Sequence, residues 1–316
     1  MPAPRVTVIV PALDAARTIG ETLAGLAEQD LGEAFEVIVV DNGSTDATAE
    51  IARAAPLGAR VLCKERDRAG TARNLGAAEA RGGVLAFTDA DCRPEPGWLR
   101  EGLAAIAAAD IVQGGVRPFS EAPRAPFDRT LWVTDDHGLF ETANLLVRRE
   151  LFEAVGGFED WSTATDLAVP FGEDTWFGWR ARRAGARVAF APTAVVEHAV
   201  FARGVREFAQ ERRRAAQFPA LVARIPELRE SLLYRRWFLS RRSARLDVAA
   251  LGLATAVCAR RLWPLGAALP YAVAVGRSTA RWRSSGPRAA AGEVLADVTT
   301  LRALVSGSIR HRTPVL

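Results

Sequence analysis

The chain has 316 residues, of which 49% are hydrophobic and 25% are charged, so it is long enough to bury a sizeable core. This composition excludes a disordered or fibrous protein and predicts one large domain with an appendage or two modest domains. The three cysteines, Cys63, Cys92 and Cys258, are odd in number and far apart, which excludes a disulfide framework or a zinc motif and indicates a reducing compartment.

The net charge of +4 hides a reversal of sign along the chain. Residues 1–202 contain 20 basic and 30 acidic side chains, a net charge of −10, whereas residues 203–316 contain 21 basic and 7 acidic side chains, a net charge of +14. We therefore predict two regions with different functions, divided near residue 202.

The first 88 residues alternate between short apolar runs and helical patterns. Strands are predicted at Arg5–Pro11, Phe35–Val40, Arg60–Lys64 and Val84–Thr88, and helices at Ile19–Gln29, Ala47–Ala54 and Gly70–Ala80. The first run is too short for a signal-peptide core. This alternation predicts a doubly wound, mostly parallel α/β sheet with right-handed crossovers. The first strand is not followed by G-x-G-x-x-G, and no P-loop sequence occurs, so neither phosphate-binding fingerprint is available.

Polar residues follow the predicted strands, and the carboxyl ends of parallel strands meet at one edge, where open α/β sheets bind ligands. Asp89 and Asp91 come directly after the fourth strand. Carboxylates suit Mg2+ or Mn2+, whose coordination is usually completed by water and substrate phosphates. The same spacing also occurs in solvated loops and helix caps, so it needs further context. Arg73 and Asn74 lie in the first turns of a helix, where a cation and backbone N–H groups can meet phosphate.

After Pro94 the pattern continues with shorter and less regular elements. Helices are predicted at Gly97–Ala108, Arg149–Val155 and Glu173–Ala184, and strands at Ile111–Val116, Thr142–Arg148, Arg187–Ala191 and Thr193–Glu197. Glu173 and Asp174 open the third of these helices, where their charge also suits the positive end of the helix dipole. His198 follows the last strand.

Several of these segments, in this order and spacing, resemble the family 2 glycosyltransferases of GT-A fold over about residues 5–200. The segments are VIVPALDAARTI, VIVVDNGSTDAT, GTARNLG, FTDADC, the Asn144 strand, GGF, GEDTWFGWRARRAG and EHA. The resemblance implies a Rossmann-like α/β domain at residues 1–202, with a mostly parallel central sheet flanked by helices. It also implies transfer of a sugar from a nucleotide-diphosphate donor with inversion at the anomeric carbon.

The resemblance assigns donor binding to eight positions. They are Pro11, Ala12, Asp41, Asn42, Arg73, Asn74, Asp89 and Ala90. Pro11 and Ala12 would lie beside the base, Asp41 would bind the base or ribose, and Arg73 the base or diphosphate. Asn42 departs from the family pattern, which more often has a second aspartate there. We expect a UDP-sugar.

The resemblance also assigns a divalent metal, Mg2+ or Mn2+, to Asp91, with Asp89 and His198 as further ligands. A lone histidine is as often structural, so its ligation stays open. Asp174, with Glu173 beside it, matches the ED motif whose aspartate removes the proton from the acceptor hydroxyl. The chemistry itself requires a base for that proton and positive charge for the leaving diphosphate.

The last third of the chain is basic and then apolar. Residues 203–245 contain 12 arginines and four glutamates, and two apolar runs follow, Val248–Ala259 and Leu262–Val275. Each is shorter than the roughly 20 residues of a membrane-spanning helix. We predict a helical extension over residues 203–316 that forms a membrane-surface or re-entrant hairpin, with Trp237 and Trp263 at the interface. The alternative is a helical subdomain packed on the catalytic core. A linker is predicted at Arg283–Gly292 and a last helix at Glu293–Ile309.

Together these features predict an inverting, metal-dependent glycosyltransferase at the cytoplasmic face of a membrane, with a glycan, lipid-linked or cell-envelope acceptor. Nucleic acid is not expected, because the acidic half would repel it. One alternative is a non-catalytic scaffold or sugar-binding member, which the presence of Asp89, Asp91 and Asp174 disfavours. The other is a sugar-nucleotide nucleotidyltransferase, which usually has a glycine-rich loop after the first strand, and this chain has none there.

Overall fold

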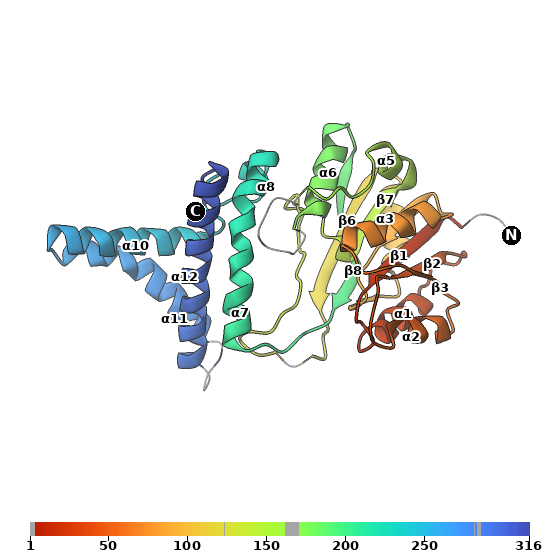
Figure 1. Ribbon diagram of the computed structural model, residues 1–316, viewed down its shortest axis with the longest axis horizontal. Coiled ribbons are helices and arrows are strands. Elements are labelled where there is room, and N and C mark those ends of the chain that lie inside the picture. Colours follow the sequence, from red (N-terminus) through yellow and green to blue (C-terminus); the bar gives the residue numbers. More distant parts are fainter. Residues whose placement is uncertain (1–3, 123, 162–170, 281, 283–285) are drawn as a thin grey trace. The chain divides into compact units, whose positions relative to one another are not determined.

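The computed structural model describes residues 4–122, 124–161, 171–280, 282 and 286–316. Its contacts divide the chain into two compact units (Figure 1). The first unit comprises residues 1–122 and 130–200, and the second comprises residues 123–129 and 201–316. The charge reversal near residue 202 therefore lies close to a structural boundary.

The first unit is an α/β domain built on one sheet with the strand order β3-β2-β1-β4-β7-β6-β8-β5. The strands are β1 (Val6–Ala12), β2 (Glu36–Asp41), β3 (Arg60–Cys63), β4 (Val84–Phe87), β5 (Cys92–Pro94), β6 (Ile111–Pro118), β7 (Leu145–Arg148) and β8 (Val188–His198). The helices are α1 (Ile19–Ala27), α2 (Thr48–Ala54), α3 (Ala69–Glu79), α4 (Trp98–Ile106), the 3-10 turn η1 (Thr142–Asn144), α5 (Arg149–Ala154) and α6 (Glu173–Arg183).

The first four strands pair in parallel, as the alternation of strands and helices predicted. β1 lies between β2 and β4, and β3 joins the outer side of β2. β7 then runs antiparallel between β4 and β6. β1, β2 and β4 are buried apolar runs because helices cover the sheet, as is usual for parallel sheets, whereas β3 at the edge is only partly buried. The prediction of a mostly parallel α/β sheet is confirmed.

The short strand β5 is a feature that the sequence did not predict. It pairs antiparallel with the end of β8, so that Cys92 lies opposite His198 and Arg93 opposite Glu197. Nothing in Cys-Arg-Pro is typical of a strand. The pairing is instead stabilised across the two strands, because Arg93 forms a 2.7 Å ion pair with the buried carboxylate of Glu197.

The two strands predicted at residues 187–197 are one continuous strand, β8. Its register with β6 shifts between Gly114 and Gly115, which pair with Ala191 and Val195. The residues between these two partners include Pro192, which has no N–H to donate to the ladder. The irregularity therefore accommodates the proline without ending the strand.

A single buried amide, that of Asn144, joins three elements of the first unit. Its Nδ2 donates hydrogen bonds of 2.8 Å to the carbonyls of Gly115 and Ala194, and its Oδ1 accepts a 2.7 Å bond from the indole of Trp98. A Cβ at Gly114 would lie 2.2 Å from this amide, so only glycine fits there. Asn144 thus fixes β6, β8 and α4 relative to one another.

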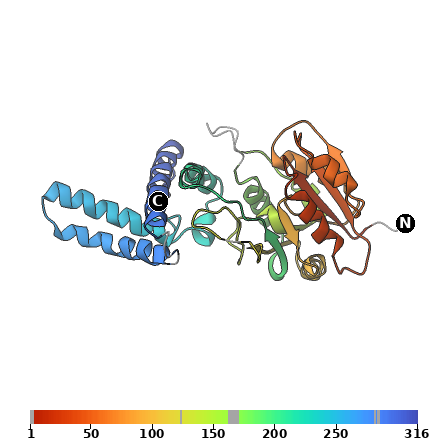
Figure 2. The same ribbon diagram turned by 90° about the horizontal axis from the view of Figure 1, so that it is seen from below.

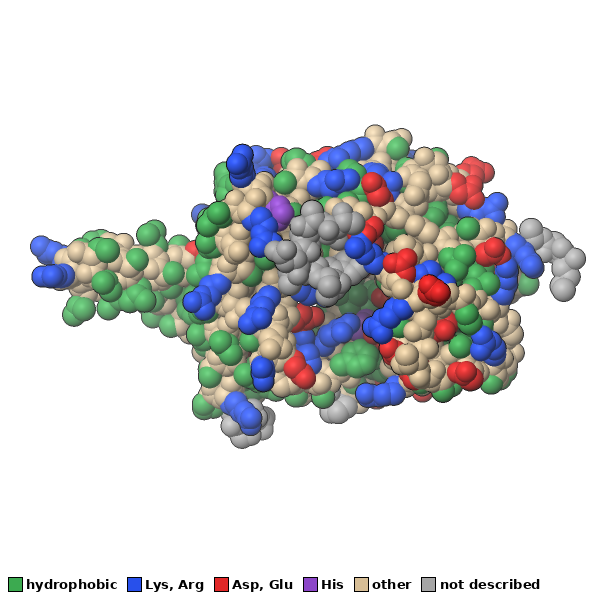
Figure 3. Space-filling view, in the orientation of Figure 1, with side chains coloured by type: hydrophobic (Ala, Val, Ile, Leu, Met, Phe, Trp, Pro, Cys, Tyr) green, Lys and Arg blue, Asp and Glu red, His purple; other side chains and the backbone are tan. Residues whose placement is uncertain are grey.

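The regular elements of the second unit are all helices in the part of the chain that the structure describes (Figure 2). Its elements are α7 (Val205–Glu211), η2 (Arg212–Gln217), α8 (Phe218–Arg224), α9 (Leu228–Ser231), α10 (Arg241–Ala259), η3 (Trp263–Ala268), α11 (Leu269–Ala280) and α12 (Gly286–His311). α10 and the η3–α11 segment form a hairpin, and Figure 3 shows hydrophobic side chains along it. None of the described helices is both long and apolar enough to cross a membrane.

The predicted linker at residues 283–292 is wrong from Gly286 onward, because α12 begins there; residues 283–285 lie outside the described residues. Glycine in this stretch reflects close packing rather than a flexible connection. A Cβ at Gly292 would lie 2.5 Å from both Phe127 and Val205. Pro287 at the start of the helix and the alanines after it are compatible with helix formation.

The Asn144 network generates a stability prediction. We expect Asn144→Ala to lower the free energy of unfolding by about 3 kcal/mol or more, because it leaves buried carbonyl groups and an indole N–H without partners. Urea unfolding would measure the loss. Gln210→Ala, which removes an exposed amide, is the control and should change stability by less than about 0.5 kcal/mol. A loss below about 1 kcal/mol in Asn144→Ala would contradict this role.

Candidate active site

The candidate site is organised around the buried guanidinium of Arg73, which is 6% exposed on α3. Its Nη2 lies 2.9 Å from Asp89 Oδ1, just beyond β4, and its Nη1 lies 3.5 Å from Glu173 Oε1, at the start of α6. Burial alone would lower the pKa of Arg73, but the nearby carboxylates outweigh it and raise the pKa above its ordinary value. A permanent positive charge therefore joins the end of β4 to the start of α6, which lies 100 residues after Arg73 in sequence.

Asp174 is the next residue of α6 and has an unusual proton affinity. Burial raises the pKa of its carboxyl to about 8, and the charge of Glu173 contributes to the rise, while Arg73 and a 2.7 Å hydrogen bond from Thr175 N oppose it. The side chain keeps a partial opening to the surface. A carboxylate of this basicity is suited to accept a proton from a weak acid near neutral pH.

The loop of residues 136–141 is held against α6 by hydrogen bonds and packing. Thr175 Oγ1 donates a 2.8 Å bond to the carbonyl of Leu139, and the indole of Trp179 donates a 2.9 Å bond to that of Gly138. Phe140 fills the space left by the missing side chain of Gly178, where a Cβ would be 2.1 Å from the ring. These contacts fix the loop beside the start of α6.

This arrangement brings Glu141 near Asp174, a neighbour that sequence reasoning missed. Burial raises the pKa of Glu141, and its charge is one of the influences that raise the pKa of Asp174. No sequence signal distinguishes Glu141 from an ordinary acidic loop residue. Its proximity results from packing between the loop and α6, which no local pattern encodes.

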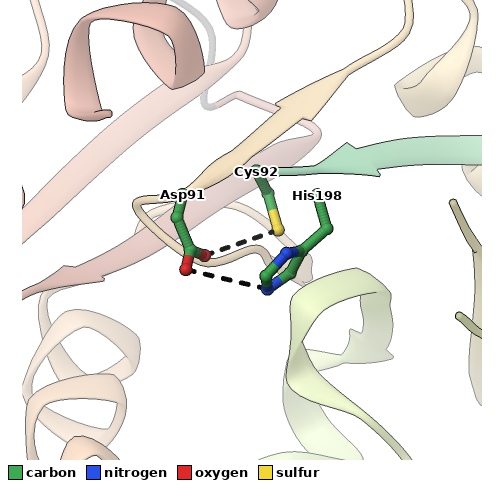
Figure 4. Close-up of side chains that lie close together, drawn as sticks. All are labelled: Asp91, Cys92 and His198. Carbon is green, nitrogen blue, oxygen red and sulfur yellow. Dashed lines mark hydrogen bonds and ion pairs between the residues drawn. The ribbon is translucent and has the colours of Figure 1, made fainter. Parts of the chain in front are cut away.

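A second group forms where β5 pairs with β8 (Figure 4). Side-chain atoms of Asp91, Cys92 and His198 lie within 4.8 Å of one another, an arrangement that can hold a metal ion. His198 Nε2 is 3.7 Å from Asp91 Oδ2, and His198 Nδ1 is 2.7 Å from the carbonyl of Ala199. A carbonyl only accepts hydrogen bonds, so Nδ1 carries a proton, and Nε2, on the Asp91 side, is the nitrogen that a metal ion would bind.

The thiol of Cys92 is a poor ligand in this group. Burial, with the charges of Asp89 and Asp91, raises its pKa well above the usual value, so it stays protonated. Sulfur is also disfavoured by hard cations such as Mg2+ and Mn2+. Asp91 and His198 are therefore the pair that fits a divalent cation. Asp89 lies outside this group and instead accepts a hydrogen bond from Arg73, so its role as a ligand stays a prediction.

The first four residues predicted to bind the donor lie together at the ends of β1 and β2. Ala12 is in register with Asp41, and its carbonyl accepts a 2.8 Å hydrogen bond from Asn42 N. The Asn42 side chain is occupied by the loop after β3, because its Oδ1 accepts a bond from Lys64 Nζ and its Nδ2 donates one to the carbonyl of Asp67. Pro11 precedes Ala12 in the same strand. The predicted convergence of these strand ends is present.

Asn74, which was predicted to lie among phosphate-binding groups, hydrogen-bonds to the backbone of Phe158. Its Nδ2 donates a 2.7 Å hydrogen bond to the carbonyl of Phe158, and its Oδ1 accepts a 2.9 Å bond from the Phe158 N–H. The amide thus orients the GGF turn, where a Cβ at Gly157 would lie 2.7 Å from Asn74 Oδ1. Ala90, between the two aspartates, is buried. Donor binding by Asn74 and Ala90 stays a prediction.

The sheet and its flanking helices have the architecture expected of a GT-A fold, and comparison with known sequences agrees. Residues 7–158 match the description "Glycosyl transferase family 2". This chain thus carries a family 2 glycosyltransferase region, as its motifs predicted.

Individual relatives are similar over part of their length. Glycosyltransferase AglE of Haloferax volcanii is 33% identical over 170 residues, which cover 49% of this chain and 56% of AglE. The succinoglycan biosynthesis protein ExoO of Rhizobium meliloti is 32% identical over 213 residues, 60% of this chain and 59% of ExoO. The chain therefore spans less than two thirds of either relative.

A solved structure supports the fold. The mannosyltransferase PcManGT from Pyrobaculum calidifontis, determined in complex with GDP-Man and Mn2+, superimposes with a TM-score of 0.57. The match covers 99% of this chain and 88% of that protein, at 23% sequence identity. At this identity the likeness establishes a shared fold.

Proposed function

We propose that this chain transfers a sugar from a nucleotide-diphosphate donor to a hydroxyl acceptor, with inversion and with a divalent metal. The observation that carries the proposal is the Arg73 group. Arg73 holds Asp89, two residues from Asp91, and Glu173, which is adjacent to Asp174. Arg73 thereby links the segment that carries the candidate metal ligand Asp91 to the segment that carries the candidate base Asp174. The proposed reaction uses both groups.

In the proposed reaction Asp174 is the base. The acceptor oxygen forms a bond to the anomeric carbon as the bond from that carbon to the diphosphate oxygen breaks, and Asp174 takes the proton from the acceptor hydroxyl. Its raised proton affinity suits this task better than that of an ordinary aspartate. Glu173 and Glu141 support that affinity through their negative charge, and Arg73 limits it.

Asp91 and His198 are the residues that would hold the cation. The hydrogen bond between His198 Nδ1 and the carbonyl of Ala199 fixes the tautomer that ligation requires. A bound divalent cation supplies positive charge that stabilises the leaving diphosphate. The presence of GDP-Man and Mn2+ on the similar fold of PcManGT supports this proposal without identifying the nucleotide.

We propose a UDP-sugar as donor, a hexose as the transferred group, and a lipid-linked or cell-envelope glycan as acceptor. The name of ExoO, a succinoglycan biosynthesis protein, supports the acceptor class. We further propose that residues 1–202 catalyse the transfer and that residues 203–316 bind the cytoplasmic face of the cell membrane. The net charge of +14 and the exposed apolar side chains of α10 and α11 support the second part.

The donor and metal sites can be tested together by thermal unfolding with UDP, GDP, dTDP or CDP, each with and without Mn2+. One nucleotide, expected to be UDP, should raise Tm by several degrees at about 100 times its Kd, and the rise should require Mn2+. Asp91→Asn and His198→Ala should remove the metal-dependent part, whereas Asp135→Asn in an exposed loop should not. A nucleotide shift that is equal with and without Mn2+ would contradict the metal site.

The base assignment predicts a specific kinetic signature. Asp174→Asn should reduce transfer at least about 100-fold while donor affinity stays within about twofold. Because the base must be deprotonated, kcat/KM should rise with pH up to about 8 and fall about tenfold per unit below it. Glu173→Gln removes a neighbouring negative charge and should move this midpoint to lower pH. The control is Glu153→Gln, an exposed site on α5. Unchanged turnover in Asp174→Asn would refute the assignment.

Membrane association is tested by sedimentation with vesicles of phosphatidylcholine and phosphatidylglycerol. The intact chain should co-sediment, and Leu251→Glu with Val257→Glu should weaken binding at least about tenfold because both side chains are 69% exposed. The charge-matched control is Gln210→Glu with Ser306→Glu, at exposed positions of the same unit. Absence of binding by the intact chain would favour the alternative of a helical subdomain without a membrane role.

A further inference from the structure

The hairpin of α10, η3 and α11 exposes apolar side chains on both of its arms. Leu251, Leu253 and Val257 of α10, Leu262 beside η3, Trp263 of η3 and Leu269 of α11 are between 57% and 81% exposed. α11 has no buried residue at all. Exposed apolar surface of this extent usually marks an interaction site.

The charges of the hairpin lie only at its two ends. Arg260 and Arg261 are exposed at the tip, where Arg260 ends α10 in a left-handed conformation with φ of 51°. Arg241, Arg245 and Arg277 are exposed at the base. Residues 248–259 and 262–276, between the ends, contain no charged side chain.

The hairpin is held as one piece, so its ends keep their separation. Gly252 of α10 packs directly on η3, where a Cβ would lie 2.6 Å from the carbonyl oxygen of Pro264. At the base, Asp297 of α12 accepts a 2.7 Å hydrogen bond from Arg242 of α10 and a 2.8 Å bond from Tyr271 of α11. α10, α11 and α12 are therefore joined by a single carboxylate.

We propose that this hairpin lies flat on an anionic membrane, with its long axis in the plane of the interface. The uncharged part of α10 is 12 residues, or about 18 Å, long. The hydrocarbon of one leaflet is about 15 Å thick. A hairpin inserted tip first would therefore place Arg260 and Arg261 near the middle of the bilayer, where charged side chains are costly. Lying flat, it immerses its apolar side chains while the arginines at both ends meet lipid phosphates.

The distribution of charge also argues for lipid rather than a second copy of the chain. The exposed charges named above are positive at both the tip and the base of the hairpin, whereas Asp247, Glu293 and Asp297 near the base are partly buried. Two hairpins paired in either direction would bring arginines against arginines, whereas a surface of anionic headgroups neutralises both ends. The proposal rests on the membrane association proposed above and adds an orientation and a lipid charge to it.

The orientation can be measured with the native Cys258, which is exposed one residue before the end of α10. In a Cys63→Ser background the buried Cys92 stays unlabelled, and Cys258 carries an environment-sensitive fluorophore such as NBD. A second variant, with Cys258→Ser and Val248→Cys, places the label near the base. On vesicles of phosphatidylcholine and phosphatidylglycerol, quenching is compared between lipids spin-labelled at the headgroup and at the middle of the acyl chain.

At both label positions the headgroup probe should quench more strongly than the acyl-chain probe. The ratio of the two quenching efficiencies should be the same at both positions within about twofold. Acyl-chain quenching that dominates at Cys258 but not at Val248→Cys would overturn the flat orientation while leaving membrane association intact. Failure of the unlabelled chain to bind vesicles would overturn both proposals, and self-association of the chain in solution would then identify a second copy as the occupant.

The charged tip gives an independent check. Arg260→Gln with Arg261→Gln should weaken binding to these vesicles about 30-fold at low salt, because each arginine near an anionic surface contributes roughly a fivefold effect. Gln210→Glu, which changes charge away from the hairpin, is the control and should have a smaller effect. Equal binding by the wild-type chain and the arginine variant would contradict a role for the tip.

Discussion

The ion pairs of buried Arg73 are the interaction on which the candidate site depends. They tie Asp89, at the end of β4, to Glu173, at the start of α6. Buried ion pairs contribute little to stability, but a carboxylate that loses its partner inside a protein is strongly unfavourable. Arg73 therefore determines which carboxylates can lie near one another. Next to this ion pair, burial and the charge of Glu173 raise the pKa of Asp174, and the charge of Arg73 opposes the rise.

The other half of the site depends on strands that meet only in three dimensions. Asp91 approaches His198 because β5 pairs with the end of β8, and the ion pair of Arg93 with Glu197 stabilises that pairing. The position of β8 in turn depends on the amide of Asn144, which binds Ala194. Two buried polar networks outside the proposed chemistry thus set the geometry in which that chemistry would take place.

The two units use charge and hydrophobicity in different ways. The first unit buries most of its apolar strands and has a net negative charge. At the edge of its sheet, Arg73 forms ion pairs with Asp89 and Glu173. The second unit is strongly basic and leaves apolar side chains of α10, η3 and α11 exposed. This contrast in charge and exposed apolar surface is the basis of the proposed membrane role of the second unit.

Much of the fold and part of the site could be predicted from the sequence because they depend on local patterns. Apolar runs ending in Pro11, Asp41 and Asp89 predicted the parallel strands and their common edge, and the ordered motifs predicted the family. The sequence also identified Arg73, Asp91 and Asp174 as candidate site residues, and their roles stay predictions.

Tertiary structure alone decided the remaining features, because each depends on residues far apart in the chain. It formed β5, brought Glu141 to Asp174, and directed the Asn74 amide to the backbone of Phe158. It also placed the start of α12 at Gly286. The sequence pattern around Gly292 predicted a linker, whereas in the structure Gly292 packs closely against Phe127 within the helix. Local periodicity reflects which face of an element is buried. It does not specify which distant residue lies against that face, and the pKa of Asp174 depends on such neighbours.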